Sequence, residues 1–290
     1  MPTPSATDRR QRFRAILAGD ACVHPGSVHD AISARIAEDL GFELGMFAGS
    51  VASLAVLGAP DIVVLTLTEF AEQARRICRG APSLPLLVDA DHGYGNALNA
   101  ARTVQELETA GVAALTIEDT VLPTPYGADK PTLLPLEEGL GKVSAALAAR
   151  NDPNLVVVAR TSAVGITGID DAVARARAYA VLGPDALFFT GITKPAELEA
   201  LAAATTLPII LGGVPAALSD RAALASHRVR VSLQGHQPFA AAVQALHDTL
   251  KALREGTPPA GLAGVASAAL MSRVTRADEY EAGRKRFLGG

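Results

Sequence analysis

Short apolar runs alternate with amphipathic stretches along most of the chain. The runs have the length of buried strands, and they end near residues 22, 47, 88, 117, 159, 189, 211 and 233. Stretches with a helical period separate them, such as Val28 to Leu40 and Asn99 to Ala110. Repeated units of strand and helix predict a parallel sheet, and eight of them fit a closed (β/α)8 barrel of the TIM type better than an open, doubly wound sheet.

The two ends of the chain add helices to this pattern. Asp8 to Ala18 reads as an amphipathic opening helix. Gly256 to Gly264 is rich in Gly and Pro and reads as a linker, followed by one final helix around Arg276 to Phe287. We therefore expect a single barrel domain over residues 1–290, with 256–290 a linker and a C-terminal helical extension. That helix is surplus to the barrel and is expected to pack on a neighbouring subunit.

Four local features are expected between these elements. The first strand is predicted at Ala21 to Val23, and Thr68 is predicted to cap a helix that runs to about Arg79. Gly49 to Ser53 reads either as a small-residue loop that a ligand can approach closely or as a plain tight turn. Thr120 to Pro135 holds several prolines and no usable period, which predicts a long mobile loop over the site.

Composition narrows the classes of function. The 290 residues suffice for one large barrel, and 49% hydrophobic residues with a formal charge of −4 indicate a soluble, mildly acidic protein. The basic clusters Arg75-Arg76 and Arg284-Lys285-Arg286 are short and read as solvated helix faces. Nucleic acid is excluded as a partner on this basis, and a small molecule is expected instead.

The cysteines and the N-terminus indicate a cellular compartment. Cys22 and Cys78 form no CxxC or zinc pattern and no disulfide framework, which fits a reducing environment. The stretch from Met1 to Arg10 is polar, and no run approaches the roughly 20 apolar residues that a membrane span requires. We expect a cytoplasmic protein that does not enter a membrane.

Two carboxylates follow directly on one buried strand. The apolar run that ends at Val88 continues into Asp89-Ala90-Asp91 and then into glycines. Side chains two apart on a strand point the same way, so both carboxylates can face one cavity. Close carboxylates repel each other, and a divalent cation relieves that repulsion. The alternative is an ordinary Asp-rich turn after a strand.

Other polar residues fall just past predicted strands, namely Ser50, Glu118, Arg160 and His236. In a barrel the carboxyl ends of the strands converge on one pocket. Each residue alone has a structural explanation, but their shared position favours a site. Three carboxylates suit a hard cation, so Mg²⁺ or Mn²⁺ is expected in preference to zinc. Arg160 is expected to bind a substrate carboxylate in a bidentate fork.

These residues also carry a resemblance to a known family. The run Asp89 to Asn96, with Gly49-Ser50 before it and Ile117 to Asp119 and Arg160-Thr161 after it, resembles the isocitrate lyase/phosphoenolpyruvate mutase superfamily. The similarity covers roughly residues 10 to 255, and the nearest branch is that of the oxaloacetate decarboxylases.

The resemblance implies roles for particular residues. It implies one Mg²⁺ beside a 2-oxo acid, with Asp89 contacting the metal directly and Asp61, Asp91 and Glu118 contacting it mainly through water. It also implies that Gly49 and Ser50 face the substrate oxyanion, that Arg160 binds the substrate carboxylate, and that His236 acts on the substrate as in decarboxylases. The family further implies a homotetramer, a dimer of dimers that exchange their last barrel helices.

The branch is chosen largely from the loop. Isocitrate and methylisocitrate lyases carry a Lys-Lys-Cys-Gly-His motif there, whereas residues 120–135 contain no Cys or His. Mutases and phosphonopyruvate hydrolases have a Lys after the Glu-Asp pair and a later Asn, whereas here Thr120 follows and the loop lacks Asn. Two positions also depart from the decarboxylase pattern: Ser162 stands where Asn is common, and Gly212 to Pro215 replaces a loop with a tyrosine.

The expected function is therefore Mg²⁺-dependent decarboxylation of oxaloacetate or a closely related 2-oxo diacid, giving a pyruvate-type product and CO₂. One alternative is another C–C or P–C bond lyase, similar to methylisocitrate or dimethylmalate lyase or to phosphonopyruvate hydrolase. Another is a non-catalytic paralogue that only binds 2-oxo acids. The exact substrate and the pathway are left open by the sequence.

Overall fold

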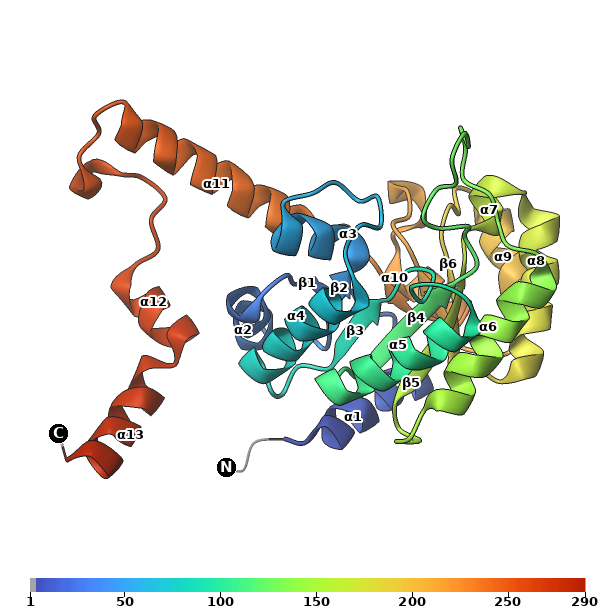
Figure 1. The fold of residues 1–290 in the computed structure, drawn as a ribbon, viewed down its shortest axis with the longest axis horizontal. Helices are drawn as coiled ribbons and strands as arrows, with labels where there is room; N and C mark the ends of the chain where they lie inside the picture. The colour runs from blue at the N-terminus through green and yellow to red at the C-terminus, as the bar shows by residue number, and fades with distance from the viewer. Residues whose placement is uncertain (1–3, 290) are drawn as a thin grey trace. The chain divides into compact units, whose positions relative to one another are not determined.

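The computed structural model describes residues 4–289, so residues 1–3 and 290 of the predicted single domain lie outside it. The described chain divides into two compact units, one that ends at Gly235 and one that begins at His236. The first unit contains an eight-stranded parallel sheet in which every strand neighbours the next one in sequence (Figure 1). The strands are β1 (Gly26–Ser27), β2 (Gly45–Ala48), β3 (Leu86–Asp89), β4 (Ala114–Glu118), β5 (Val156–Thr161), β6 (Ala186–Phe189), β7 (Ile209–Leu211) and β8 (Val229–Ser232).

The sheet closes on itself through the chain that precedes β1. The Val23 N–H donates to the Arg230 carbonyl at 2.9 Å, and the Ser232 N–H donates to the Val23 carbonyl at 3.0 Å. These two bonds form an isolated parallel bridge between Val23 and Val231. The predicted (β/α)8 barrel is thereby confirmed. The predicted first strand is misplaced, because Pro25 offers no N–H and the regular strand begins only at Gly26.

Helices follow the strands and form the outer layer of the barrel, except for α1, which precedes β1. Those of the first unit are α1 (Ala6–Ala18), α2 (Ala31–Asp39), α3 (Gly49–Ala52), α4 (Leu67–Gly80), α5 (Ala97–Ala110), α6 (Leu136–Ala149), α7 (Ala163–Ile166), α8 (Ile169–Leu182), α9 (Pro195–Ala204) and α10 (Arg221–Ser226). The opening helix α1 buries Phe13 and Leu17 against side chains from the barrel interior, among them Leu44 and Ala113, which precede β2 and β4. Helix α1 therefore packs at the amino ends of the strands and leaves the carboxyl ends for the site.

Two local predictions are wrong. Helix α4 is capped by Thr66, whose hydroxyl accepts from the Glu69 N–H at 3.3 Å while the Glu69 carboxylate accepts from the Thr66 N–H at 2.9 Å. This reciprocal capping box outcompetes the predicted cap Thr68, which has no glutamate three residues later. The predicted loop from Gly49 to Ser53 is instead helical, as α3 followed by a π-helical turn over Ser53–Leu57.

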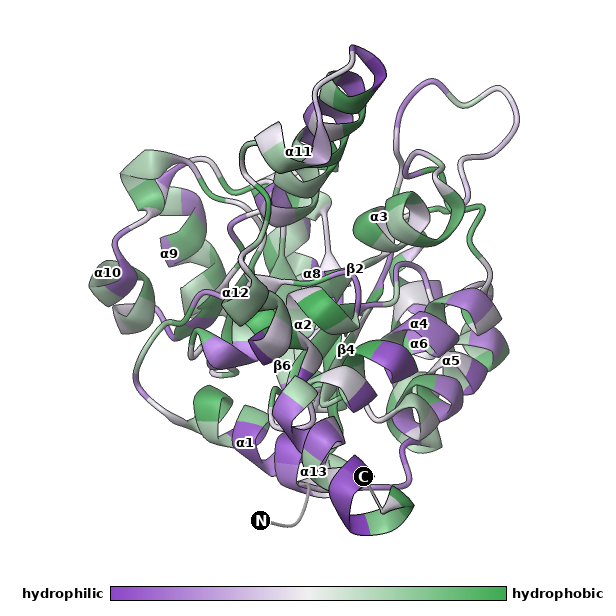
Figure 2. Cartoon of the chain, turned by 90° about the vertical axis from the view of Figure 1, so that its left-hand side faces the viewer, coloured by the Kyte–Doolittle hydropathy of each residue, from purple (hydrophilic) through white to green (hydrophobic). Residues whose placement is uncertain are grey.

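The described part of the second unit contains three α-helices, α11 (Gln237–Arg254), α12 (Ala268–Thr275) and α13 (Ala277–Leu288), and a short 3-10 helix over Pro259–Gly261. The sequence predicted one helix after the linker, but Arg276 adopts a left-handed backbone with φ of 59° and separates two. Helix α11 exposes a row of large apolar side chains. Its ribbon in Figure 2 carries both hydrophilic and hydrophobic colours. These side chains are Val243, Leu246, Leu250 and Leu253. Their spacing places them on one face of the helix.

Two negative expectations of the sequence can be compared with the described chain. Within residues 4–289, no helix is both long enough and apolar enough to cross a membrane. Cys22 and Cys78 are both buried free thiols.

Candidate active site

The inner face of the barrel turns from apolar to polar toward the carboxyl ends of the strands. Leu87, Ala114 and Val158 belong to the core inside the barrel. Side chains two residues further along a strand face the same side. Asp89 on β3, Glu118 on β4 and Arg160 on β5 therefore point into the same end of the barrel. The sequence predicted this convergence, and the contacts between these three side chains confirm it.

Arg160 forms ion pairs with two of the predicted carboxylates. Its Nη1 pairs with Asp89 Oδ2, and its Nε lies 3.3 Å from Glu118 Oε2. The guanidinium also stacks over the ring of Phe188, with 5.2 Å between its central carbon and the ring centroid. Burial by itself lowers the pKa of Arg160, but Asp89 and Glu118 more than reverse this, so the pKa is raised and the group stays charged.

Two threonine hydroxyls hold the same carboxylates. Thr116 Oγ1 donates to Asp89 Oδ1 at 2.6 Å, and Thr120 Oγ1 donates to Glu118 Oε2 at 3.1 Å. All four residues are buried. Each carboxylate thus contacts a neutral hydroxyl donor as well as the Arg160 guanidinium. Together these two contacts restrict the orientation of the carboxylate.

Asp91 lies beside the same cluster and has an unusual backbone conformation. Its φ of 46° is left-handed, and its carbonyl accepts from the Glu118 N–H at 2.9 Å. Its carboxylate lies directly against the backbone of Gly49, where any Cβ would collide with both carboxylate oxygens. Position 49 therefore requires glycine for reasons of space.

The cluster carries an excess of negative charge. Burial raises the pKa of Asp91 well above its ordinary value, and the charges of Asp89 and Glu118 raise it further. Burial likewise raises the pKa of Glu118, with Asp89 adding to the effect against the opposing influence of Arg160. One guanidinium does not balance three ionised carboxylates, so an added cation would be favourable here.

The donor set fits a hard divalent cation, since it consists of carboxylate oxygens. In the described residues, no group of three His, Cys, Asp or Glu side chains is already arranged to hold a metal ion. Arg160 instead pairs with both Asp89 and Glu118. The residues therefore suit Mg²⁺ or Mn²⁺ provided that Arg160 turns away from them.

The remaining predicted site residues lie in different surroundings. Gly49 and Ser50 begin helix α3 after β2, with Gly49 buried and Ser50 half-buried. Asp61 is exposed, and its charge contributes to the raised pKa of Asp91. His236 is the first residue of the second unit and precedes α11. The parts assigned to Ser50, Asp61 and His236 in binding stay predictions.

The loop after β4 has a paired stem and an exposed tip. Thr120 and Leu133 form an antiparallel bridge, and the Val121 N–H donates to the Thr132 carbonyl at 2.9 Å. Residues 123–131 are exposed, with Tyr126 fully so. The predicted long connection is therefore present with a short stem, and its movement stays a prediction.

A buried network behind the site was not predicted. Asp119 Oδ2 accepts from Arg175 Nη1 at 3.0 Å and from the Tyr179 hydroxyl at 2.8 Å. Arg175 Nη2 donates to the Leu134 carbonyl at 3.1 Å at the far end of the loop. Strand alternation was the available signal, because it turns Asp119 outward between the inward-facing Glu118 and Thr120.

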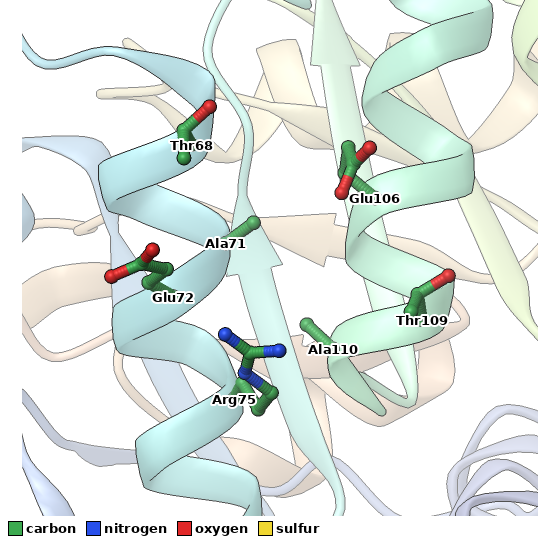
Figure 3. A pocket seen from close by; sticks show the side chains of 7 residues that line it. All are labelled: Thr68, Ala71, Glu72, Arg75, Glu106, Thr109 and Ala110. Carbon is green, nitrogen blue, oxygen red and sulfur yellow. The ribbon is translucent and has the colours of Figure 1, made fainter.

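The outer layer also contains a pocket of about 130 Å³ between α4 and α5 (Figure 3). Thr68, Glu72 and Arg75 approach it from one helix, and Glu106 and Thr109 from the other. None of its lining residues is among the predicted site residues. The pocket is therefore separate from the carboxylate cluster.

Comparison with known proteins finds relatives in both sequence and fold. Residues 13–254 match the phosphoenolpyruvate phosphomutase family. The chain is 64% identical over 281 residues to an oxaloacetate decarboxylase of Bradyrhizobium diazoefficiens, covering 97% of each chain. Among solved structures, phosphonopyruvate hydrolase in complex with oxalate and Mg²⁺ superposes with a TM-score of 0.83 at 30% identity, covering 97% of this chain and 99% of that one.

A 2,3-dimethylmalate lyase superposes with a TM-score of 0.84 at 29% identity, covering 98% of this chain and 99% of the other. That enzyme is itself a member of the phosphoenolpyruvate mutase/isocitrate lyase superfamily. The extent of the sequence match, together with the shared barrel, shows that this chain belongs to the phosphoenolpyruvate phosphomutase family of that superfamily.

Proposed function

We propose that this protein is an oxaloacetate decarboxylase that releases pyruvate and CO₂ and depends on Mg²⁺. The observation that carries the proposal is the 64% identity, over nearly the whole chain, to a relative with that name. The loop without Cys or His also supports it, because decarboxylation requires no acid/base from that loop to cleave the bond.

In the proposed metal site Asp89 contacts the metal directly, and Asp91, Glu118 and Asp61 contribute mainly through water. The charge excess at this cluster supports the assignment, as does the Mg²⁺ in a related phosphonopyruvate hydrolase. Mn²⁺ suits the same oxygen donors. A divalent cation supplies Lewis-acid stabilisation of the oxygen on which negative charge develops.

The protein side chains are assigned the remaining tasks. Arg160 leaves Asp89 and Glu118 and binds the C1 carboxylate of oxaloacetate in a bidentate fork. The bond between C3 and C4 breaks, its electrons move to the C2 oxygen, and C4 departs as CO₂. Ser50 donates a hydrogen bond to the C2 oxygen, and His236 orients the departing carboxylate. The loop of residues 120–135 excludes water until C3 receives a proton.

The assay is pyruvate formation from oxaloacetate above the background of free metal. We expect activity in Mg²⁺ that EDTA removes and that Asp89→Ala abolishes. His236→Ala is expected to reduce activity far more than the matched substitution Cys78→Ala, which changes a buried thiol. A rate that neither EDTA nor Asp89→Ala alters would refute the mechanism.

A second candidate is a different reaction, either lyase chemistry on another acid or hydrolysis of oxaloacetate itself. Its support is the close structural similarity to 2,3-dimethylmalate lyase and to oxaloacetate acetylhydrolase, the latter with a TM-score of 0.85 at 25% identity. A panel of dimethylmalate, methylisocitrate, phosphonopyruvate and oxaloacetate distinguishes the candidates when the products are identified, because hydrolysis of oxaloacetate gives oxalate whereas decarboxylation gives pyruvate. Stabilisation by oxalate without turnover of any of them would favour a protein that only binds 2-oxo acids.

The proposed assembly is a homotetramer, a dimer of dimers that exchange C-terminal helices, in the cytoplasm. The exposed apolar face of α11 supports an interface, because such a row is unfavourable in water. Light scattering tests the assembly. We expect Leu246→Glu together with Leu250→Glu to reduce the measured mass, whereas an unchanged mass would exclude this face as the interface.

A further inference from the structure

Three consecutive residues at the end of β4 alternate between the site and the outer layer. Glu118 points inward to Arg160, Asp119 points outward to α8, and Thr120 points inward again to Glu118. All three are buried, with exposed fractions of 5%, 2% and 7%. The chain is thus held on both faces at the point where the loop departs.

The outward contacts fix the base of the loop. Asp119 is bound by Arg175 and Tyr179, which lie one turn apart on α8. The Leu134 N–H donates to the Asp119 carbonyl at 2.7 Å, so the returning end of the loop attaches to the same residue. Arg175 also contacts the Leu134 carbonyl. Both ends of the loop are therefore tied to one helix.

The inward contact connects this fixed base with the site. Thr120 pairs with Leu133 in the stem of the loop, and its hydroxyl donates to Glu118 Oε2. That oxygen is also the one nearest the Nε of Arg160. The other oxygen of Glu118 has neither of these two partners, which leaves it available to a further ligand.

We propose that Thr120 is a positioning residue, which couples the stem of the loop to Glu118 and orients that carboxylate toward a divalent cation. The inference rests on the proposed function for its metal and its substrate. When Arg160 turns to the substrate, Glu118 loses its cation partner, and the Thr120 hydroxyl is the contact that keeps the carboxylate in place. Hydroxyls that orient a metal-binding carboxylate in this way commonly strengthen metal binding tenfold or more.

The test measures Mn²⁺ binding by calorimetric titration in the presence of saturating oxalate, whose carboxylates give Arg160 a partner other than Asp89 and Glu118. Thr120→Val removes the donor and keeps a β-branched side chain, whereas Thr120→Ser keeps the donor. We expect the dissociation constant for Mn²⁺ to rise about tenfold in Thr120→Val and to stay close to that of the unmodified protein in Thr120→Ser. Tyr179→Phe, which removes a hydroxyl from the outer side of the same chain segment, is the matched control. It is expected to lower the melting temperature measured in EDTA and to leave Mn²⁺ affinity unchanged.

Each outcome separates this inference from the proposed function. The inference is overturned if Thr120→Val has the same dissociation constant for Mn²⁺ as the unmodified protein. It is also overturned if Thr120→Ser binds Mn²⁺ as weakly as Thr120→Val. Protein that binds Mn²⁺ with the expected order of affinities but does not decarboxylate oxaloacetate refutes the proposed function alone. Loss of turnover in Thr120→Val with unaltered Mn²⁺ affinity overturns the inference and leaves the proposed function in place.

Discussion

Thr190 donates a hydrogen bond from Oγ1 to the hydroxyl of Ser162 at 2.8 Å, which joins the ends of β6 and β5. Gly212, after β7, packs on the same threonine, since a Cβ there would lie 3.1 Å from Thr190 Cγ2. Ser162 and Gly212 are two positions where the sequence departs from the decarboxylase pattern. Both positions therefore meet at one side chain, that of Thr190.

We expect Thr190→Val to raise the KM for oxaloacetate about fivefold while kcat changes less. The loss of one neutral hydrogen bond corresponds to about 1 kcal/mol, and Ser162 follows Arg160 by only two residues. Steady-state kinetics with saturating Mg²⁺ provide the measurement. The control is Thr193→Val, because Thr193 bonds to Glu197 in an exposed position. Equal KM values for the two variants would remove Ser162 and Thr190 from the substrate wall.

Gly49→Ala is expected to displace the Asp91 carboxylate and to weaken metal binding about tenfold or more. The cause is steric, because a Cβ on residue 49 would overlap that carboxylate. The concentration of Mg²⁺ that gives half-maximal activity is the quantity to measure. Gly141→Ala on α6 is the control, since nothing lies within 4 Å of its Cβ position and alanine favours a helix. An unchanged Mg²⁺ requirement in Gly49→Ala would contradict the placement of Asp91 at the metal.

The contribution of His92 to the stability of the metal-free protein is expected to fall between pH 6.5 and about 4. Burial, together with the charge of Lys142, lowers the pKa of His92 from 6.5 to about 4. The unfolded chain therefore takes up a proton at a higher pH than the folded protein. The contribution of neutral His92 to the free energy of unfolding is fully present above pH 6.5. It is lost as the pH falls from 6.5 to about 4, by up to about 1.4 kcal/mol per pH unit.

Urea unfolding in EDTA at several pH values tests this expectation. His92→Gln is expected to have a shallower decline in the free energy of unfolding across the range. His247→Gln, which removes an exposed histidine on α11, should keep the slope of the unmodified protein. The same slope in all three proteins would show that His92 titrates normally.

Chymotrypsin is expected to cleave after Tyr126 at the tip of the loop, because that side chain is fully exposed. If the loop closes over bound ligand, Mg²⁺ with oxalate should slow this cleavage, as followed by mass spectrometry of the fragments. Tyr126→Ala identifies the fragment by abolishing it. A cleavage rate that does not respond to Mg²⁺ and oxalate would show that the loop does not act as a lid.

The sequence was sufficient to predict the barrel and the convergence of Asp89, Glu118 and Arg160. Both follow from strand periodicity and from the common direction of parallel strands. The pairing of Arg160 with the carboxylates themselves was not predictable, since it depends on distances between strands. The ion pair between Asp119 and Arg175 was not predictable either, since it depends on the distance between the end of β4 and helix α8.

Two local predictions, the N-terminal cap of α4 and the loop over residues 49–53, were wrong for different reasons. Thr66 and Thr68 both suit a helix cap, and Glu69 decides in favour of Thr66 by completing the capping box. Residues 49–53 have the small side chains of a loop, yet tertiary packing folds them as α3 and the turn that follows. Composition alone does not reveal such packing.

The bridge from Val23 to Val231 gives the barrel one seam that differs from its other strand pairs. Every other pair joins neighbours in sequence, so each forms with a short intervening segment, whereas the seam joins the two ends of the first unit. Closing so long a segment costs more chain entropy. Two backbone hydrogen bonds of the bridge offset this cost, together with side-chain contacts such as that of Arg221 Nε, which donates to the Cys22 carbonyl at 2.7 Å. We therefore expect the ring to close last during folding and to open first under denaturing conditions, because the other strand pairs each join sequence neighbours.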